Sequence, residues 1–188
     1  MIKLGTIVIL CSMAIAMPVF CCSAEDPKEL EQWFHDLTTK TEQKVTKLHF
    51  YLQDLRGITT TIVAQSNTSL TSPTFFGLTY MVDDPLTVGP SQASKVVGRA
   101  QGLYGLSSKE DMRLFMAIDI VFTDGTYNGS ALTVLGSNPL TQPKRELPVI
   151  GGTGVFRLAR GVALLNTYFF NAALGNATVE YTVIVQHY

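Results

Sequence analysis

The chain has little cysteine, and the first 22 residues hold all three of its cysteines. The same segment begins with a charge at Lys3, continues as an apolar run over residues 7–20, and ends in small residues before Ala24. A charged start, an apolar stretch and a small-residue cleavage site together predict a secretory signal peptide over residues 1–24. The apolar run is too short to span a membrane as a helix.

Cleavage there would leave residues 25–188 without a thiol. The mature chain would have no disulfide, no thiol nucleophile and no cysteine-ligated metal. A secreted domain of this kind has to be stabilised by its own hydrophobic core. The length predicts one domain, with a helical arm over residues 25–45 before the main body.

The chain also lacks an excess of charge of one sign. Lysine and arginine total 14 against 15 acidic residues, for a net charge of −1, and no basic cluster is present. A nucleic-acid partner is therefore not expected. After residue 20 there is no second long apolar run, so we expect no membrane partner either. Three sequons fit the secretory route and predict glycosylation at Asn67, Asn128 and Asn176.

Residues 151–161 form a glycine-rich run that lacks the residues of a nucleotide-binding loop. Val155, and not lysine, follows Gly154, so the run is not a P-loop. Arg157 stands where a dinucleotide fingerprint needs its third glycine. The run therefore predicts a turn between two strands.

Strand-forming segments dominate the rest of the chain. A capped start at Asp26 and helical spacing of apolar residues predict one amphipathic helix, which ends near Lys40. Asp124-Gly125 predicts a hairpin turn. Many short strands with one helix favour an antiparallel barrel or sandwich. The expected strands are residues 48–52, 59–64, 75–82, 93–103, 114–123, 127–135, 146–150, 156–158, 162–169 and 178–185.

Four segments in this order resemble the plant dirigent protein family over essentially the whole mature chain. They are His49–Asp54, Val97–Tyr104, Gly151–Gly161 and Val179–Tyr188. The resemblance implies an all-β fold, an eight-stranded antiparallel β-barrel with a short N-terminal helix, usually a homotrimer. It further implies secretion to the apoplast and a phenolic ligand in the barrel, without an oxidative centre, cofactor or metal.

The resemblance also implies a set of site residues. Asp54 would orient a phenol hydroxyl or act as acid or base, and Tyr104 would bind a phenolic oxygen. Arg145 would stabilise developing negative charge on oxygen. Each residue also has a structural alternative. Asp54 could be a turn residue, Tyr104 could be a core or interface aromatic, and Arg145 could form an ion pair with a nearby carboxylate. Arg99 is a weaker candidate with a structural role.

Phe50, Tyr51 and Asn138 would contribute substrate binding. Asn138 replaces an aspartate of lignan-forming members, and Leu106 replaces their second tyrosine. The disulfide common in those members is absent too. These departures place the chain nearer the dirigent-like branch that includes the pterocarpan synthases, and they leave proton donation to Asp54 alone.

Two functions follow from the resemblance. The favoured one is a non-oxidative auxiliary that directs the coupling of monolignol radicals supplied by an oxidase such as laccase. The alternative is an enzyme that removes water from an isoflavanol and closes a ring through a quinone methide. A ligand-free wall or defence protein is the third possibility.

Overall fold

The computed structural model describes residues 27–39 and 42–188. The predicted signal peptide and its three cysteines lie outside the described residues. Helix α1 covers Pro27–Thr39, as the sequence predicts. The nine strands are β1 (Lys44–Asp54), β2 (Thr60–Ala64), β3 (Thr79–Thr87), β4 (Val96–Leu106), β5 (Arg113–Phe122), β6 (Ala131–Pro139), β7 (Lys144–Thr153), β8 (Arg160–Asn171) and β9 (Asn176–His187).

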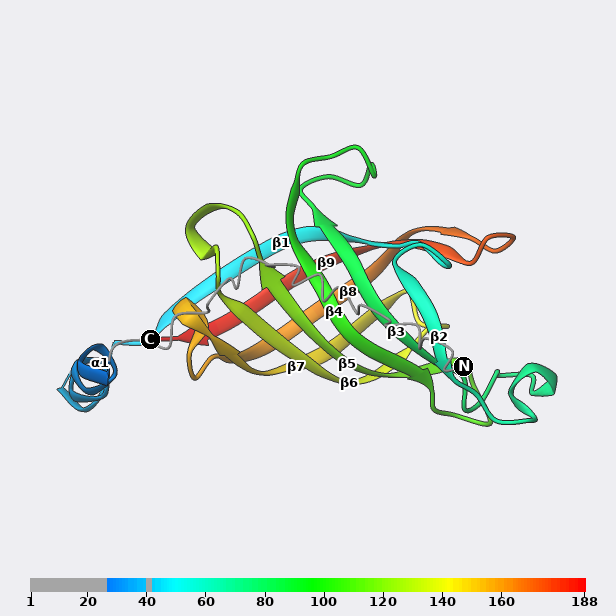
Figure 1. Cartoon of the computed structure of the whole chain (residues 1–188), viewed down its shortest axis with the longest axis horizontal. Coiled ribbons are helices and arrows are strands. Elements are labelled where there is room, and N and C mark those ends of the chain that lie inside the picture. The colour runs from blue at the N-terminus through cyan, green and yellow to red at the C-terminus, as the bar shows by residue number, and fades with distance from the viewer. Residues whose placement is uncertain (1–26, 40–41) are drawn as a thin grey trace, which may run out of the picture.

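All strand pairs between named strands are antiparallel, and the sheet closes on itself. The order is β1-β9-β8-β7-β6-β5-β4-β3-β2, and β1 also pairs with β3 through Tyr51–Thr87 and Leu52–Leu86. Eight strands therefore form a closed barrel, while β2 lies on the remaining edge of β3 (Figure 1). This confirms the predicted eight-stranded antiparallel β-barrel, and closure protects strand edges that an open sheet would expose.

Side-chain alternation along the strands fills the barrel. On β5, Leu114, Met116, Ile118, Ile120 and Phe122 are buried, and the residues between them are more exposed. The same period of two places one apolar face of each strand inside. The barrel interior is therefore the hydrophobic core of the protein.

Gly102 of β4 is required by a close backbone approach. A β-carbon there would lie 2.2 Å from the Ala117 carbonyl oxygen of β5, and the φ angle is +144°. Other residues rarely adopt that backbone conformation. Glycine at this position therefore permits the close approach of β4 and β5.

The glycine-rich run is the connection between β7 and β8, as predicted. However, the strand expected at residues 156–158 does not form. A 3₁₀ turn covers Gly154–Phe156, and Leu158 has a φ angle of +60°. Phe156 is fully buried and packs against Phe122 and Tyr127. The apolar character of this segment therefore reflects a buried aromatic side chain in a turn, not a strand.

The hairpin expected at Asp124-Gly125 is a longer connection. A 3₁₀ turn occupies Gly125–Tyr127, and β6 begins only at Ala131. Strand β3 likewise starts at Thr79 and not at residue 75, where Phe75 has a φ angle of +54°. Local β propensity failed at these places because turn geometry prevailed over it.

An aromatic ring of helix α1 contacts the connection between β7 and β8. The Arg157 guanidinium lies 4.5 Å from the centre of the Trp33 ring. Such a cation–π contact agrees with a packing role for this tryptophan. In the described part of the chain no helix has the length and apolar character needed to cross a membrane.

Candidate functional site

Asp54 and Tyr104, two of the predicted site residues, contact each other in the barrel. Asp54 is the last residue of β1, and Tyr104 is a buried residue of β4. The Tyr104 hydroxyl donates a hydrogen bond of 2.9 Å to Asp54 Oδ2. Asp54 therefore does more than form a turn, and Tyr104 does more than pack in the core.

Asp84 is a site residue that the sequence reasoning missed. It lies on β3, shares the inward face with Tyr80 and Val82, and is 2 % exposed. Burial, and then the charge of Asp54, raises the pKa of the Asp84 carboxyl to about 7. The signal was available: an aspartate occupies an inward position of an alternating apolar strand.

Thr60 connects the two carboxyl groups. Its hydroxyl lies 2.7 Å from Asp54 Oδ1 and 3.2 Å from Asp84 Oδ1. The neighbouring Thr59 hydroxyl makes a short hydrogen bond to the same Asp84 oxygen. Thr60 is the first residue of β2 and Thr59 lies in the turn before it, so the start of this edge strand supplies the hydroxyl groups that bind the carboxyl pair.

The phenol of Tyr104 remains neutral. Burial raises the pKa of Tyr104 well above its usual value, and the charge of Asp54 and the hydrogen bond to it raise the pKa further. The Tyr104 ring packs on the Tyr80 ring at a centroid distance of 5.1 Å. The Arg56 guanidinium lies 5.0 Å from the Tyr80 ring centre. Tyr104 therefore acts as a hydrogen-bond donor toward Asp54.

Arg145 of β7 is a buried cation, 5 % exposed. Its Nη2 donates a hydrogen bond of 2.8 Å to the Thr167 hydroxyl, and its Nε has no partner among the described residues. Burial lowers the pKa of the guanidinium, although an arginine stays charged at neutral pH. The structural alternative for Arg145 was an ion pair with a carboxylate. Among the described residues Arg145 forms no such pair, and its Nε–H is left without an acceptor.

Asn138 of β6 is also buried, at 4 % exposure, and carries an unpartnered acceptor where Arg145 carries an unpartnered donor. Its amide nitrogen lies 3.1 Å from Met116 Sδ, while Oδ1 has no partner among the described residues. Asn138 and Arg145 stand on the two arms of one hairpin. Buried polar atoms without partners are unusual in native proteins. An acceptor and a donor of this kind suit a ligand that carries hydroxyl groups.

Tyr181 of β9 links the arginine to the carboxyl pair electrostatically. Burial raises the pKa of Tyr181, Arg145 lowers it, and Asp84 and Asp54 raise it. Tyr181 also stacks on Phe50 at a centroid distance of 5.5 Å. Phe50 therefore belongs to the barrel interior, as a substrate-binding residue requires.

Tyr51 is not brought to this cluster, contrary to our expectation of substrate binding. Strand alternation points it to the opposite face from Phe50, where its hydroxyl lies 3.3 Å from Glu180 Oε1. Its ring meets Tyr168 at 5.7 Å. Arg99 pairs with Asp83, which supports the structural role expected for it.

The three sequon asparagines lie in or beside turns. Asn67 and Asn128 are exposed. Asn176 is half-buried, and its Oδ1 accepts a hydrogen bond of 3.0 Å from the Arg56 backbone amide. Glycosylation at these three positions stays a prediction.

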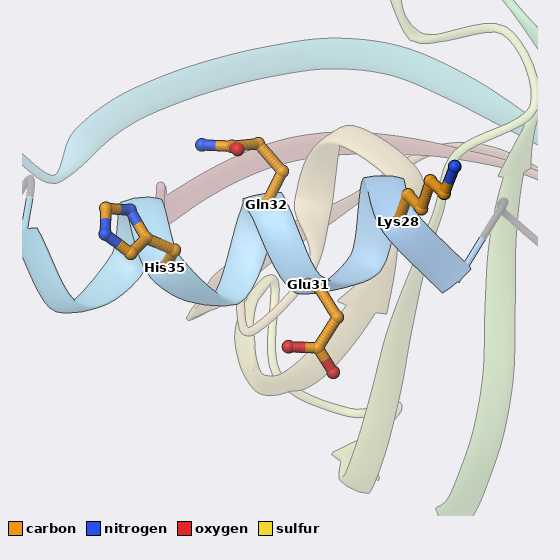
Figure 2. A pocket seen from close by; sticks show the side chains of 4 residues that line it. All are labelled: Lys28, Glu31, Gln32 and His35. Carbon is orange, nitrogen blue, oxygen red and sulfur yellow. The ribbon is translucent and has the colours of Figure 1, made fainter.

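One surface pocket lies apart from the barrel interior. Lys28, Glu31, Gln32 and His35 line it (Figure 2), and all four are exposed residues of helix α1. None of them belongs to the cluster around Asp54. The candidate site is therefore the set of buried polar groups inside the barrel.

These features define a class of protein: a closed antiparallel barrel whose apolar interior carries a carboxyl pair, a neutral tyrosine and a buried arginine. The protein-family model described as Dirigent-like protein matches residues 45–186. Dirigent protein 23 of Arabidopsis thaliana is 44% identical over 161 residues, which is 84% of this chain and 86% of the relative. The chain belongs to the dirigent family.

Pterocarpan synthases are among the similar proteins. Pterocarpan synthase 1 of Glycine max is 44% identical over 151 residues, covering 78% of this chain and 81% of that protein. The solved structure of the pterocarpan synthase dirigent protein GePTS1 matches with a TM-score of 0.72 at 44% identity. That match covers 78% of this chain and 87% of the solved chain.

Proposed function

We propose that this protein binds a phenolic alcohol inside the barrel and catalyses its dehydration and ring closure through a quinone methide. The observation that carries the proposal is the pair of carboxyl groups, Asp54 and Asp84, that the Thr60 hydroxyl joins inside the barrel. The same barrel holds two unpartnered buried atoms, Arg145 Nε and Asn138 Oδ1. A binding role alone would not need the second buried carboxyl group, that of Asp84, whose pKa burial raises to about 7. The pterocarpan synthase relatives support this choice.

The residues divide the chemistry between two ends. The substrate's phenol binds as a phenolate against Arg145, whose unused Nε donates to the oxygen. Asp54 protonates the benzylic hydroxyl, which leaves as water and yields a quinone methide. A second hydroxyl of the same molecule adds to the electron-poor carbon and returns its proton to Asp54. One water is lost, and the phenolate is restored.

Stereoselective coupling of phenoxy radicals is the second candidate. It needs an oxidase to supply the radicals and needs only orientation from the barrel. Arg145 Nε and Asn138 Oδ1 could orient phenols without any acid. Arabidopsis relatives named dirigent proteins are as similar as the synthases, for example dirigent protein 21 at 46% identity.

Two incubations separate the candidates. In the first, the purified protein receives a chiral isoflavanol with a free second phenol and no oxidant. In the second, it receives coniferyl alcohol with a laccase. Pterocarpan formation in the first supports the dehydratase, and an enantiomeric excess of lignan in the second supports coupling. Asp54→Asn should abolish the first activity, with Asp119→Asn, an exposed β5 variant, as the matched control. If wild-type protein is silent with the isoflavanol, the dehydratase proposal fails.

We further propose that the protein is secreted to the apoplast, glycosylated and homotrimeric. The signal-peptide pattern and the exposure of Asn67 and Asn128 support the first two. Exposed apolar side chains on the outer barrel face, such as Phe115 and Leu164, support association. Mass determination by light scattering, before and after glycosidase treatment, tests both the trimer and the sugars.

A further inference from the structure

We propose that Asp84 is a positioning residue that stores the proton which Asp54 delivers and exchanges it through the Thr60 hydroxyl. This inference rests on the proposed function and names the origin of its proton. The sequence left proton donation to Asp54 alone. The structure adds a second carboxyl group and a hydroxyl between the two.

The Thr60 hydroxyl can donate to only one of the two carboxyl groups that it contacts. The hydroxyl contacts Asp54 Oδ1 at 2.7 Å and Asp84 Oδ1 at 3.2 Å but has only one hydrogen to donate. If that hydrogen goes to the nearer oxygen, that of Asp54, the contact with Asp84 is favourable only when the Asp84 carboxyl donates. The geometry therefore fits a chain from the Asp84 carboxyl through Thr60 to the Asp54 carboxylate.

The surroundings decide which carboxyl holds the proton at rest. Asp54 accepts a hydrogen bond from Thr60 at one oxygen and from Tyr104 at the other. Asp84 is almost fully buried on β3, so its charged form is disfavoured. The pKa of Asp84 agrees, because burial and then Asp54 raise it to about 7.

The charged and titratable neighbours come from several strands. Asp54 of β1 and Asp83 of β3 raise the pKa of Asp84, whereas the hydroxyls of Thr59 and Thr60 lower it. Arg56 lowers the pKa of Tyr104, and Arg145 lowers the pKa of Tyr181. Within the described residues, no cation is among the groups that shift the pKa of Asp84, which leaves the proton as the means of neutralising its charge.

The transfer balances without a further reactant. The Asp84 carboxyl gives its proton to Thr60 Oγ1, and Thr60 gives its own hydrogen to Asp54 Oδ1. Asp54 is then neutral and Asp84 is charged. After Asp54 protonates the leaving hydroxyl, the proton released by the attacking hydroxyl returns to Asp54. Asp54 then gives a proton to Thr60 Oγ1, and Thr60 gives its own hydrogen back to the Asp84 carboxylate.

Two variant pairs test the role by kinetics with the isoflavanol. Thr60→Val keeps the shape of the side chain and removes the relay, whereas Thr60→Ser keeps the hydroxyl. Asp84→Asn removes the store, and Asp83→Asn is the control, since Asp83 is exposed and paired with Arg99. We expect kcat to fall by about 10²-fold for Thr60→Val and Asp84→Asn, with KM nearly unchanged and with rescue by Thr60→Ser. Equal activity of Thr60→Val and wild type would overturn the relay.

A titration without substrate keeps this inference separate from the proposed function. Carbon-13 NMR of labelled aspartate carboxyls should show one group that titrates near neutral pH in wild type and in Asp83→Asn, and that disappears in Asp84→Asn. If no carboxyl titrates there, the proton store is refuted even when the isoflavanol is turned over. If it titrates while no isoflavanol reacts, the store stands and the proposed reaction fails.

Discussion

Replacing Asp84 with asparagine should stabilise the protein, and the gain should grow as the pH rises. Asparagine keeps the size of the side chain and cannot ionise. In the wild type, folding raises the pKa of this carboxyl from 3.8 to about 7, chiefly through burial. The folded state therefore binds the proton more tightly than the unfolded state, and stability falls as the pH rises between these two values.

The magnitude follows from the same shift. One pKa unit corresponds to about 1.4 kcal/mol, so the full cost of ionising Asp84 in the folded protein is about 4 kcal/mol at alkaline pH. Only part of the cost is present near pH 5, where this group is already largely ionised in the unfolded state but still protonated in the folded state. Between about pH 5 and about pH 8 the wild type should lose roughly 2–3 kcal/mol relative to Asp84→Asn.

Urea unfolding at a series of pH values measures this difference directly. The free energies of unfolding of wild type, Asp84→Asn and Asp83→Asn are compared at each pH. Asp83 is the matched control because the hydrogen bond from Arg99 lowers its pKa, so that its stabilisation is lost only as the pH falls through the acid range. A difference between wild type and Asp84→Asn that does not change from acid to alkaline pH would refute the reasoning.

Three further substitutions test the site and the barrel. Tyr104→Phe keeps the ring contact with Tyr80 but removes the hydrogen bond to Asp54, so turnover should fall by about 10²-fold while the melting temperature changes little. Arg145→Met removes a buried cation with an unpartnered Nε; turnover should fall by about 10²–10³-fold, while urea unfolding should show a protein as stable as wild type or more so by about 1 kcal/mol. Gly102→Ala should cost about 2–4 kcal/mol or prevent folding, because its β-carbon would lie 2.2 Å from a carbonyl oxygen. Normal thermal melting of Gly102→Ala would contradict the close approach.

Much of the fold could be predicted because its signals are local. Alternating apolar residues mark strands such as β5, and helical spacing of apolar residues marks helix α1. The predicted strand at residues 156–158 was wrong since apolar character does not separate a strand from a buried turn. Phe156 is buried by neighbouring rings at the barrel end, which no local pattern shows.

The candidate site was only partly predictable for a related reason. The family resemblance brought Asp54, Tyr104 and Arg145 forward, and the structure joins the first two by a hydrogen bond. The resemblance treated Tyr51 as a site residue, but strand alternation places it on the outer face. Neither the resemblance nor composition indicated Asp84 or Thr60.

A strand-rich domain without thiols beyond its first 22 residues, the turn at the glycine-rich run and membership of the dirigent family can all be read from the chain. The hydrogen-bonded chain of Asp84, Thr60 and Asp54 becomes visible only in the folded barrel. The reason is physical. Alternation tells which side of its own strand a residue occupies, but barrel closure between β1 and β3 decides which inward residues of distant segments meet.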